Sequence, residues 1–333
     1  MIIASQIRDF LNLFSKLSFA KIRNGILILN SYYQSKSTRN PILKGLPIAI
    51  SVEPTTSCNL RCPQCPSGLR SFTRPTGMLE PQLFESVVDQ LHSTLIYLTF
   101  YFQGEPYLNP HFLAMVKYAS LKDIYTSTST NGHYLDDKNS KKTVESGLDR
   151  LIISIDGTTQ ESFAKYRIGG DLEKVIAGLK TLIKWKKELK IATPFIVLQF
   201  IVFRHNEHEI KEIKSMARLL GIHLQIKTAQ VYDESDKEIL LPENKKYSRY
   251  HHTAELIDSC WKMWHSCVIT WDGKVVPCCF DKDAKYKLGD VKTASFKEIW
   301  QSEPYQNFRK SLLISRKEID ICTNCSEGAK VFA

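Results

Sequence analysis

The sequence predicts an α/β protein built on a partial, TIM-like (β/α)6 barrel and followed by a small C-terminal domain. Between residues 47 and 230, short apolar runs typical of strands alternate with amphipathic runs typical of helices. This alternation indicates a parallel sheet covered by helices. A doubly wound sheet would carry a glycine-rich phosphate loop after its first strand. Here that loop is rich in cysteine, so we favour the barrel.

The expected elements follow from the hydrophobic pattern. Strands are predicted at 48–53, 95–102, 125–130, 150–155, 195–203 and 224–228. Helices are predicted at 81–92, 111–120, 136–146, 172–188 and 207–220. The predicted domains are an N-terminal amphipathic extension (1–46), the barrel (47–230), a polar linker with a short helix (231–259) and the C-terminal domain (260–333).

Composition places the chain among ordinary globular proteins, with 43% apolar and 24% charged residues in a length of 333. Nine cysteines are too few for a disulfide scaffold, and their clustering points to metal binding in a reducing cytoplasm. We find no pattern of a cleavable signal peptide and expect a cytoplasmic protein. The formal charge of +10 suggests an acidic partner or anionic surface. The lysines are spread along helix faces, so specific nucleic-acid binding is not expected.

Residues 1–46 combine apolar and basic residues at helical spacing but contain no apolar run long enough to span a membrane. Two interpretations stay open. The extension is either a helix packed on the barrel or a helix that lies on an anionic membrane surface, which would make the protein peripheral at the membrane.

Three cysteines lie within eight residues directly after the first predicted strand: Cys58, Cys62 and Cys65. Iron–sulfur clusters are usually held by four thiolates, so three leave one iron without a protein ligand. An open metal position is typical of catalytic sites. The alternatives are three unrelated buried cysteines or a structural zinc site. A zinc site would need a fourth ligand nearby, and the nearest downstream histidine is His92.

The spacing Cys58-x3-Cys62-x2-Cys65 resembles the signature of the radical S-adenosylmethionine (SAM) superfamily. The resemblance implies a [4Fe-4S] cluster whose open iron chelates SAM. One electron, from a donor such as flavodoxin or ferredoxin, would then cleave SAM to methionine and a 5′-deoxyadenosyl radical. It also implies the partial barrel, whose site lies at the carboxyl ends of the strands.

Further segments resemble SAM-binding motifs of that superfamily. Gln103-Gly104-Glu105-Pro106 is similar to its Gly-Gly-Glu-Pro motif, which binds the amino group of SAM, with Gln103 in place of the first glycine. The resemblance implies SAM contacts by Asn131 and Ser154. Asp156 has two readings, as a SAM contact or as the cap of the following helix.

Two more residues complete the predicted barrel site. Arg167 follows the fourth strand in a Tyr-Arg pair that resembles SPASM-type radical SAM proteins, where this arginine faces the SAM carboxylate or the substrate. The alternative for Arg167 is a surface salt bridge. Apolar residues at the end of the fifth strand, including Val202, are expected to pack against adenine.

The C-terminal domain has a metal spacing of its own. A Trp-Asp-Gly turn between short strands at 267–270 and 274–276 would bring Cys267 and Cys278 together. The distant pair Cys322 and Cys325 would complete four thiolates. The arrangement resembles the SPASM and twitch domains and implies one auxiliary [4Fe-4S] cluster, with zinc as the alternative. Cys260 and Cys279 are left over as buried thiols. Adjacent residues of an extended segment point to opposite faces, so only one of Cys278 and Cys279 should bind metal.

The sequence therefore predicts a radical SAM enzyme that abstracts hydrogen from a substrate in an oxidation or another modification. We see no separate leader-peptide domain near the N-terminus, which favours a small molecule or a protein side chain as substrate over a peptide. The basic charge and the amphipathic residues 1–46 leave a lipid-linked or envelope substrate open. The competing hypothesis is a non-catalytic iron–sulfur or zinc protein that acts in electron transfer or binding.

Overall fold

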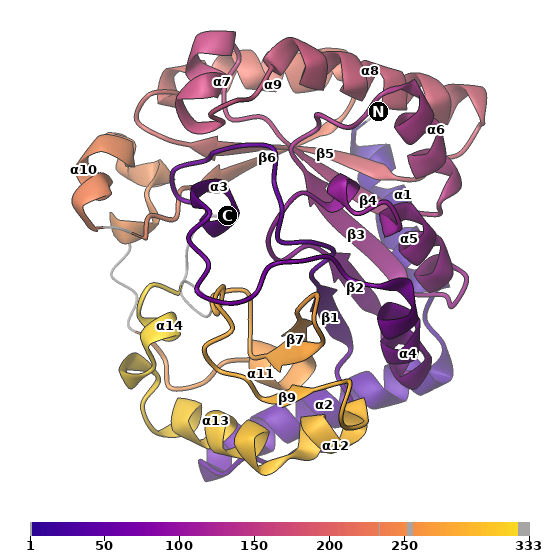
Figure 1. Ribbon diagram of the computed structural model, residues 1–333, viewed down its shortest axis with the longest axis vertical. Helices are drawn as coiled ribbons and strands as arrows, with labels where there is room; N and C mark the ends of the chain where they lie inside the picture. Colours follow the sequence, from indigo (N-terminus) through magenta and orange to yellow (C-terminus); the bar gives the residue numbers. More distant parts are fainter. Residues whose placement is uncertain (1, 233, 252–255, 326–333) are drawn as a thin grey trace.

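The computed structural model describes residues 2–232, 234–251 and 256–325 (Figure 1). The described residues form one nine-stranded sheet in the order β6-β5-β4-β3-β2-β1-β7-β8-β9. The first six strands are β1 (Ala49–Val52), β2 (Tyr97–Phe100), β3 (Tyr125–Thr130), β4 (Arg150–Ser154), β5 (Phe195–Val202) and β6 (His223–Thr228). Their sequential order confirms the predicted partial barrel.

Strands β1 to β6 are all parallel, so their carboxyl ends meet at one edge. The helices between them lie around the outside of the curved sheet (Figure 1). They are α4 (Pro81–Leu91), α5 (Phe112–Ser120), α6 (Asp137–Glu145), α7 (Gln160–Tyr166), α8 (Leu172–Glu188) and α9 (Ile210–Leu220). Their buried apolar faces join the sheet in one continuous hydrophobic core. Of these six helices, α7 is the one that lies outside the predicted helical ranges.

The C-terminal segment extends the barrel sheet. Strand β7 (Ser266–Ile269) pairs in parallel with β1, and β8 (Lys274–Val276) and β9 (Gly289–Asp290) follow as antiparallel neighbours. The predicted hairpin is confirmed. The helices of this segment are α11 (Lys262–His265), α12 (Phe296–Gln301), α13 (Glu303–Ile314) and α14 (Asp320–Thr323). The barrel and the C-terminal unit therefore share one backbone hydrogen-bond ladder.

Two further regions complete the fold. Between β6 and α11 the described chain forms short turns, including α10 (Lys237–Leu240). At the other end of the chain, α1 (Ile2–Ser15) lies behind the sheet and α2 (Phe19–Thr38) runs along the bottom of the view in Figure 1. Helix α2 packs against α11. Among the helices described, none combines the length and the apolar character that crossing a bilayer requires.

Candidate functional site

The three-cysteine loop follows β1 and ends in the short helix α3 (Pro66–Leu69). Cys62 is buried, and Cys58 and Cys65 are half-buried. The backbone N–H of Cys65 donates to the Cys62 carbonyl (3.2 Å), and the N–H of Leu60 donates to the Cys58 sulfur (3.4 Å). These local bonds shape the loop, and all three cysteines line the same cavity.

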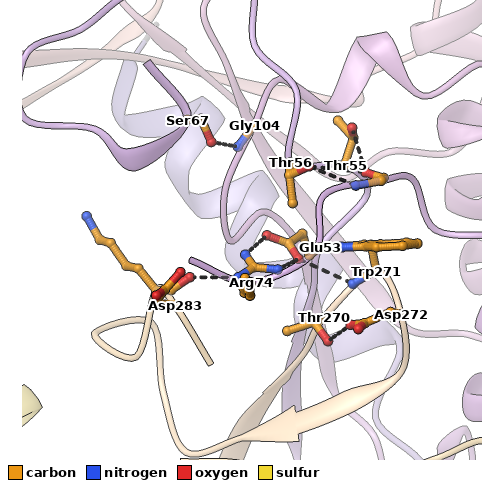
Figure 2. Close-up of polar contacts among 12 residues, drawn as sticks. Glu53, Thr55, Thr56, Ser67, Arg74, Gly104, Thr270, Trp271, Asp272 and Asp283 are labelled. Carbon is orange, nitrogen blue, oxygen red and sulfur yellow. Dashed lines mark hydrogen bonds and ion pairs between the residues drawn. The ribbon is translucent and has the colours of Figure 1, made fainter. Parts of the chain in front are cut away.

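Glycine allows the turn after β2 to pack against this loop. Gly104 has a φ of +73°, and a Cβ there would lie 2.2 Å from the Thr55 carbonyl oxygen. Its N–H donates to the Ser67 hydroxyl (2.9 Å; Figure 2). The neighbouring Glu105 N–H donates to the Ser57 carbonyl (2.8 Å). Any larger side chain at position 104 would push the turn away from the cysteines.

The Glu105 carboxylate points to the end of β3. It accepts from the Thr130 hydroxyl (2.8 Å) and from the backbone N–H of Asn131 (2.8 Å). Burial raises the pKa of Glu105 to about 7, although these donors lower it. The Asn131 amide N–H donates to the Asn59 side chain (2.8 Å) and lies 3.8 Å from the Cys58 sulfur. The end of β3 thus connects Glu105 to the cysteine loop.

Arg167 lies at the end of α7 and reaches back to the cysteines. Its Nε donates to Asp156 (2.7 Å), its Nη2 lies 2.6 Å from the same carboxylate, and its Nη1 lies 3.8 Å from the Cys62 sulfur. Asp156 also accepts from the Ile201 N–H (2.7 Å). The surface salt-bridge alternative for Arg167 is therefore wrong, because the pair is buried beside a thiol.

The capping alternative for Asp156 is also wrong. Helix α7 begins after Thr159, whose side chain accepts from the Ser162 N–H, three residues beyond Asp156. The Asp156 carboxylate is used by Arg167 and by β5 instead. It is fully buried and does not line the cavity described next.

A cavity of about 720 Å³ opens at the carboxyl ends of the strands. It is lined by the three loop cysteines and by most of the other predicted site residues: Gln103, Gly104, Glu105, Asn131, Ser154 and Arg167. The structure therefore brings together residues from four strand–helix connections. This is the edge at which barrel enzymes place their sites.

Besides Asp156, Val202 is the other predicted barrel-site residue that does not line the cavity. Its side chain is fully buried in the core beneath the helices. Its neighbours Ile201 and Phe203 line the cavity, together with Gln199. Because successive strand residues point to opposite faces, a shift of one position moves a side chain from the cavity to the core.

One wall of the cavity is cationic, which the sequence analysis did not predict. Lys227 at the end of β6, Arg249 and Lys282 all line it. Within the described residues, no carboxylate offsets the effect of burial on Lys227. Burial lowers the pKa of Lys227, and repulsion by Lys262 and Arg249 lowers it further. Glu105 is the one carboxylate among the described lining residues, and it lies at β2–β3.

Lys282 faces the same cavity from the C-terminal unit. Its ammonium lies 3.9 Å from the centroid of the Tyr232 ring. Burial lowers the pKa of Lys282 to about 8. Most Lys282 side chains are therefore still protonated at neutral pH. The Tyr232 ring stabilises this positive charge without neutralising it.

A second, smaller cavity lies within the C-terminal unit and is lined by four cysteines: Cys260, Cys278, Cys322 and Cys325. The Arg316 guanidinium lies 3.2 Å from the Cys325 sulfur. Cys267, predicted as the partner of Cys278, lines neither cavity. Its Cα pairs with Ile50 of β1, and its thiol is buried in the core beside Tyr305. The structure thus groups Cys260, rather than Cys267, with the other three.

Cys278 and Cys279 point in opposite directions, as expected for adjacent residues. Cys278 lines the smaller cavity, and Cys279 lines the large one. The prediction that Cys279 is a buried thiol is wrong, because its side chain is exposed. Its sulfur lies 4.0 Å from the Lys262 ammonium.

A buried ion pair ties the cysteine-loop region to the C-terminal unit (Figure 2). Arg74 donates two hydrogen bonds to Glu53, at 2.8 and 2.6 Å, and its Nε donates to the Lys282 carbonyl (3.0 Å). Glu53 also accepts from the Trp271 N–H (3.3 Å), and the Thr73 N–H donates to Asp283 (2.9 Å). The sequence offers one signal for this link, an acidic residue directly after a buried strand.

The donor sets fit iron–sulfur clusters. Burial raises the pKa of Cys58 to about 11 and also raises that of Cys62, so these thiols need a bound cation to become thiolates. Within the described residues no three His, Cys, Asp or Glu side chains are grouped tightly enough for a single metal ion. The fit therefore rests on the soft thiol ligands and on the cavities that they share. Fold and site together define a parallel-barrel protein with an iron–sulfur centre.

Comparison with known proteins gives the family. The model of the radical SAM superfamily matches residues 52–219, and the model of the SPASM iron–sulfur cluster-binding domain matches residues 260–326. The chain belongs to the radical SAM superfamily and carries a SPASM domain. Membership implies a [4Fe-4S] cluster and SAM as cofactors, and the SPASM domain implies auxiliary iron–sulfur binding.

Several characterised relatives span most of the chain. A tungsten-containing aldehyde ferredoxin oxidoreductase cofactor-modifying protein from Pyrococcus furiosus is 26% identical, over 83% of this chain and 86% of its own. The mycofactocin maturase MftC of Mycobacterium ulcerans is 24% identical, over 78% and 75%. A SAM-dependent 2-deoxy-scyllo-inosamine dehydrogenase from Niallia circulans is 22% identical, over 83% and 92%.

Solved structures share the fold. BtrN in complex with AdoMet and 2-DOIA has a TM-score of 0.53 at 21% identity, and covers 87% of this chain and 97% of its own. SuiB of Streptococcus suis bound to its precursor peptide has a TM-score of 0.62 at 12% identity, over 85% and 70%. At these identities the likeness concerns architecture.

Proposed function

We propose that this protein reductively cleaves SAM and uses the resulting 5′-deoxyadenosyl radical to abstract hydrogen from an anionic substrate held in the large cavity. The single observation that carries the proposal is the open three-thiol loop. Cys58, Cys62 and Cys65 lie at the wall of a cavity whose volume, about 720 Å³, is within the range of ligand-binding pockets. The bound cluster supplies the electron that breaks the sulfonium bond, after reduction by a donor such as flavodoxin or ferredoxin.

The residues around the loop have separate roles in this proposal. Gln103, Gly104 and Glu105 form the turn that binds the SAM ammonium, because this turn brings carbonyls and a carboxylate to the loop. Asn131 and Ser154 bind polar groups of SAM from the ends of β3 and β4. Arg167, held by Asp156, presents its remaining N–H groups toward Cys62 and the SAM carboxylate. Asp156 is a positioning residue.

The cationic wall supports an anionic substrate. Lys227, Arg249 and Lys282 come from three separate segments and converge on one cavity. Carboxylate and phosphate groups are the ligands that such cations bind most strongly. The relatives include enzymes named for peptide modification and one named for a small cyclitol. Acidic peptide side chains and small acidic molecules are therefore the two substrate forms to test.

The four thiols of the smaller cavity support one auxiliary [4Fe-4S] cluster. We propose Cys260, Cys278, Cys322 and Cys325 as its ligands, with Cys260 in place of Cys267. Four thiolates satisfy every iron, so this cluster has no open position for substrate. Its role would be to exchange electrons with the substrate or with the donor.

Anaerobic reconstitution with iron, sulfide, dithionite and SAM tests the proposal. We expect release of 5′-deoxyadenosine by the wild type and by a Cys279→Ala control, and none by Cys62→Ala. Intact SAM under strong reductant, in protein that holds its full iron, would leave a non-catalytic iron–sulfur protein as the better description.

Deuterated candidates test the substrate class. Each pair consists of a deuterated carboxylic acid and the corresponding deuterated amide. The transfer of deuterium from each member to 5′-deoxyadenosine is measured. We expect transfer from the acidic member. In a Lys227→Gln/Lys282→Gln variant, the KM for the acidic member should rise by about 10- to 100-fold. Equal deuterium transfer from both members would contradict an anionic substrate.

A further inference from the structure

Helices α1 and α2 turn large apolar side chains toward solvent. Of the nineteen exposed large hydrophobic residues in the described chain, nine lie between positions 7 and 33. They are Ile7, Phe10, Leu11, Phe14, Phe19, Ile22, Ile26, Leu29 and Tyr33. On each helix they recur at intervals of three or four residues, or of seven, which places them on one face. We call this set the outward apolar face.

The inward side of α2 is polar. Its buried residues are Lys21, Asn24, Ser31, Ser35 and one apolar residue, Ile28. The Asn24 amide donates to the Leu46 carbonyl (2.7 Å), and the Ser35 hydroxyl accepts from the Ile42 N–H (2.8 Å). Rotating the helix to bury its apolar face would therefore break these bonds and leave buried polar groups without partners.

Helix α1 and the turn after it attach to the barrel in the same polar way. The Asn12 amide donates to Asp149 (2.7 Å), and Lys16 forms an ion pair with the same carboxylate (2.5 Å). Asp9 is buried and pairs with Arg150 and with the Tyr125 hydroxyl. Both helices thus use polar contacts to hold their apolar residues outward.

The charge around the outward apolar face is positive. Exposed basic residues of this segment are Arg8, Arg23, Lys36, Arg39 and Lys44. Asp9 is the one acidic residue among positions 1–46, and it is buried. If two copies of this chain associated through this face, the basic residues of one copy would lie against those of the other. Charge repulsion therefore disfavours self-association through this face.

We propose that α1 and α2 form a docking surface for anionic membranes, with the helices lying in the plane of the interface. Exposed aromatic and aliphatic side chains flanked by arginine and lysine are what such a surface requires. The bound helices contact the starts of β3, β4 and β6, through Lys21 to Asp123, Asp9 to Arg150 and Gln6 to His223. The large cavity lies at the opposite ends of these strands, so the docked enzyme opens its site toward water.

Vesicle flotation of the full-length holoprotein tests this surface. One set of vesicles is pure phosphatidylcholine and the other contains about 30% phosphatidylglycerol. We expect flotation with the anionic vesicles, weakened at about 0.5 M salt because salt screens the basic residues.

Two matched variants separate the outward apolar face from general surface hydrophobicity. The test variant carries glutamine at four exposed positions of the face: Phe10→Gln, Phe14→Gln, Ile22→Gln and Ile26→Gln. The control carries glutamine at four exposed apolar positions elsewhere: Leu121→Gln, Leu219→Gln, Ile239→Gln and Ile314→Gln. We expect at least about a tenfold loss of vesicle binding in the first and none in the second. Thermal unfolding of each verifies that the fold is intact.

Three results would overturn the proposal. They are no flotation with either vesicle type, equal loss in both variants, and a dimer in light scattering that the first variant alone dissociates. The last would assign the face to a second copy of the chain. Because none of these measurements uses SAM cleavage, they are independent of the proposed catalytic function.

Discussion

The Arg167 guanidinium bridges the buried Asp156 carboxylate and the Cys62 thiol, at 2.7 and 3.8 Å. Asp156 is fixed in turn by the backbone of β5. The orientation of one basic side chain at the cluster loop therefore depends on two neighbouring strands.

Asp156→Asn should release this arginine. We expect 5′-deoxyadenosine release to fall at least about tenfold and the free energy of unfolding to drop by about 3–5 kcal/mol, because one charge of a buried pair loses its partner. Chromatographic product assays and urea unfolding measure the two effects. Glu161→Gln, which breaks the exposed pair with Lys165, is the control and should cost under about 1 kcal/mol. Unchanged activity in Asp156→Asn would remove the positioning role.

Iron content should distinguish the fourth ligand of the auxiliary site. We expect about eight iron atoms per chain in the reconstituted wild type and about four in Cys260→Ala. Cys267→Ala should keep about eight, although it leaves a void in the core. The reverse pattern would restore Cys267 as the ligand.

SAM affinity should depend on pH through Glu105. Its pKa is raised to about 7, mainly by burial, so the carboxylate is neutral below that pH and ionised above it. Because the SAM ammonium binds the ionised form better, we expect the Kd for SAM to fall as pH rises from about 6 to 8. Glu105→Gln should bind weakly and show no such slope. Equilibrium binding to the oxidised holoprotein measures both, and a Kd that rises with pH would contradict this role.

Folding stability should depend on Glu105 with the opposite sign. A carboxyl pKa that is higher in the folded state means that the folded protein holds more protons. This contribution to stability is full below the unfolded pKa of about 4.3 and is lost as pH rises toward about 7. Urea unfolding of SAM-free protein across this range, compared with Glu105→Gln, isolates the effect. A difference between the two proteins that does not change with pH would refute it.

The Glu53–Arg74 pair should stabilise the joint between barrel and C-terminal unit. Arg74→Leu leaves the buried Glu53 charge without its bidentate partner, and we expect a loss of about 3–5 kcal/mol in urea unfolding. Lys285→Gln, at the exposed pair with Asp320, should change stability by less than about 1 kcal/mol. A loss of similar size in both variants would show that the buried pair has no special role.

The sequence was sufficient for the strand order of the barrel and for the cysteine loop, since both depend on local patterns. The prediction failed where successive residues of a strand face the cavity and the core in turn. Val202 and Ile201 are equally apolar, and the clearest sign of the cavity face was the polar Gln199 on the same side as Ile201. The predicted role of Cys267 as a metal ligand did not take account of its apolar neighbours Val268 and Ile269, which mark a buried strand. Its role stays a prediction for the iron measurement to test.

The orientation of the N-terminal helices also lay beyond sequence reasoning. Periodicity identifies an apolar face, but not whether protein or solvent lies against it. The deciding contacts are long-range, such as Asn12 to Asp149 and Gln6 to His223. Likewise, the cationic wall joins residues far apart in the chain, so no local pattern reveals it.

Strand β1, which carries the cysteine loop, is hydrogen-bonded on one side to β2 and on the other to β7. Sliding or hinging between the two iron–sulfur centres would have to shear this ladder. We therefore expect the spacing between the two proposed centres to stay constant, so that an electron passing between them would always cross the same distance. We expect access to the large cavity to depend on movements of loops rather than on separation of the two units.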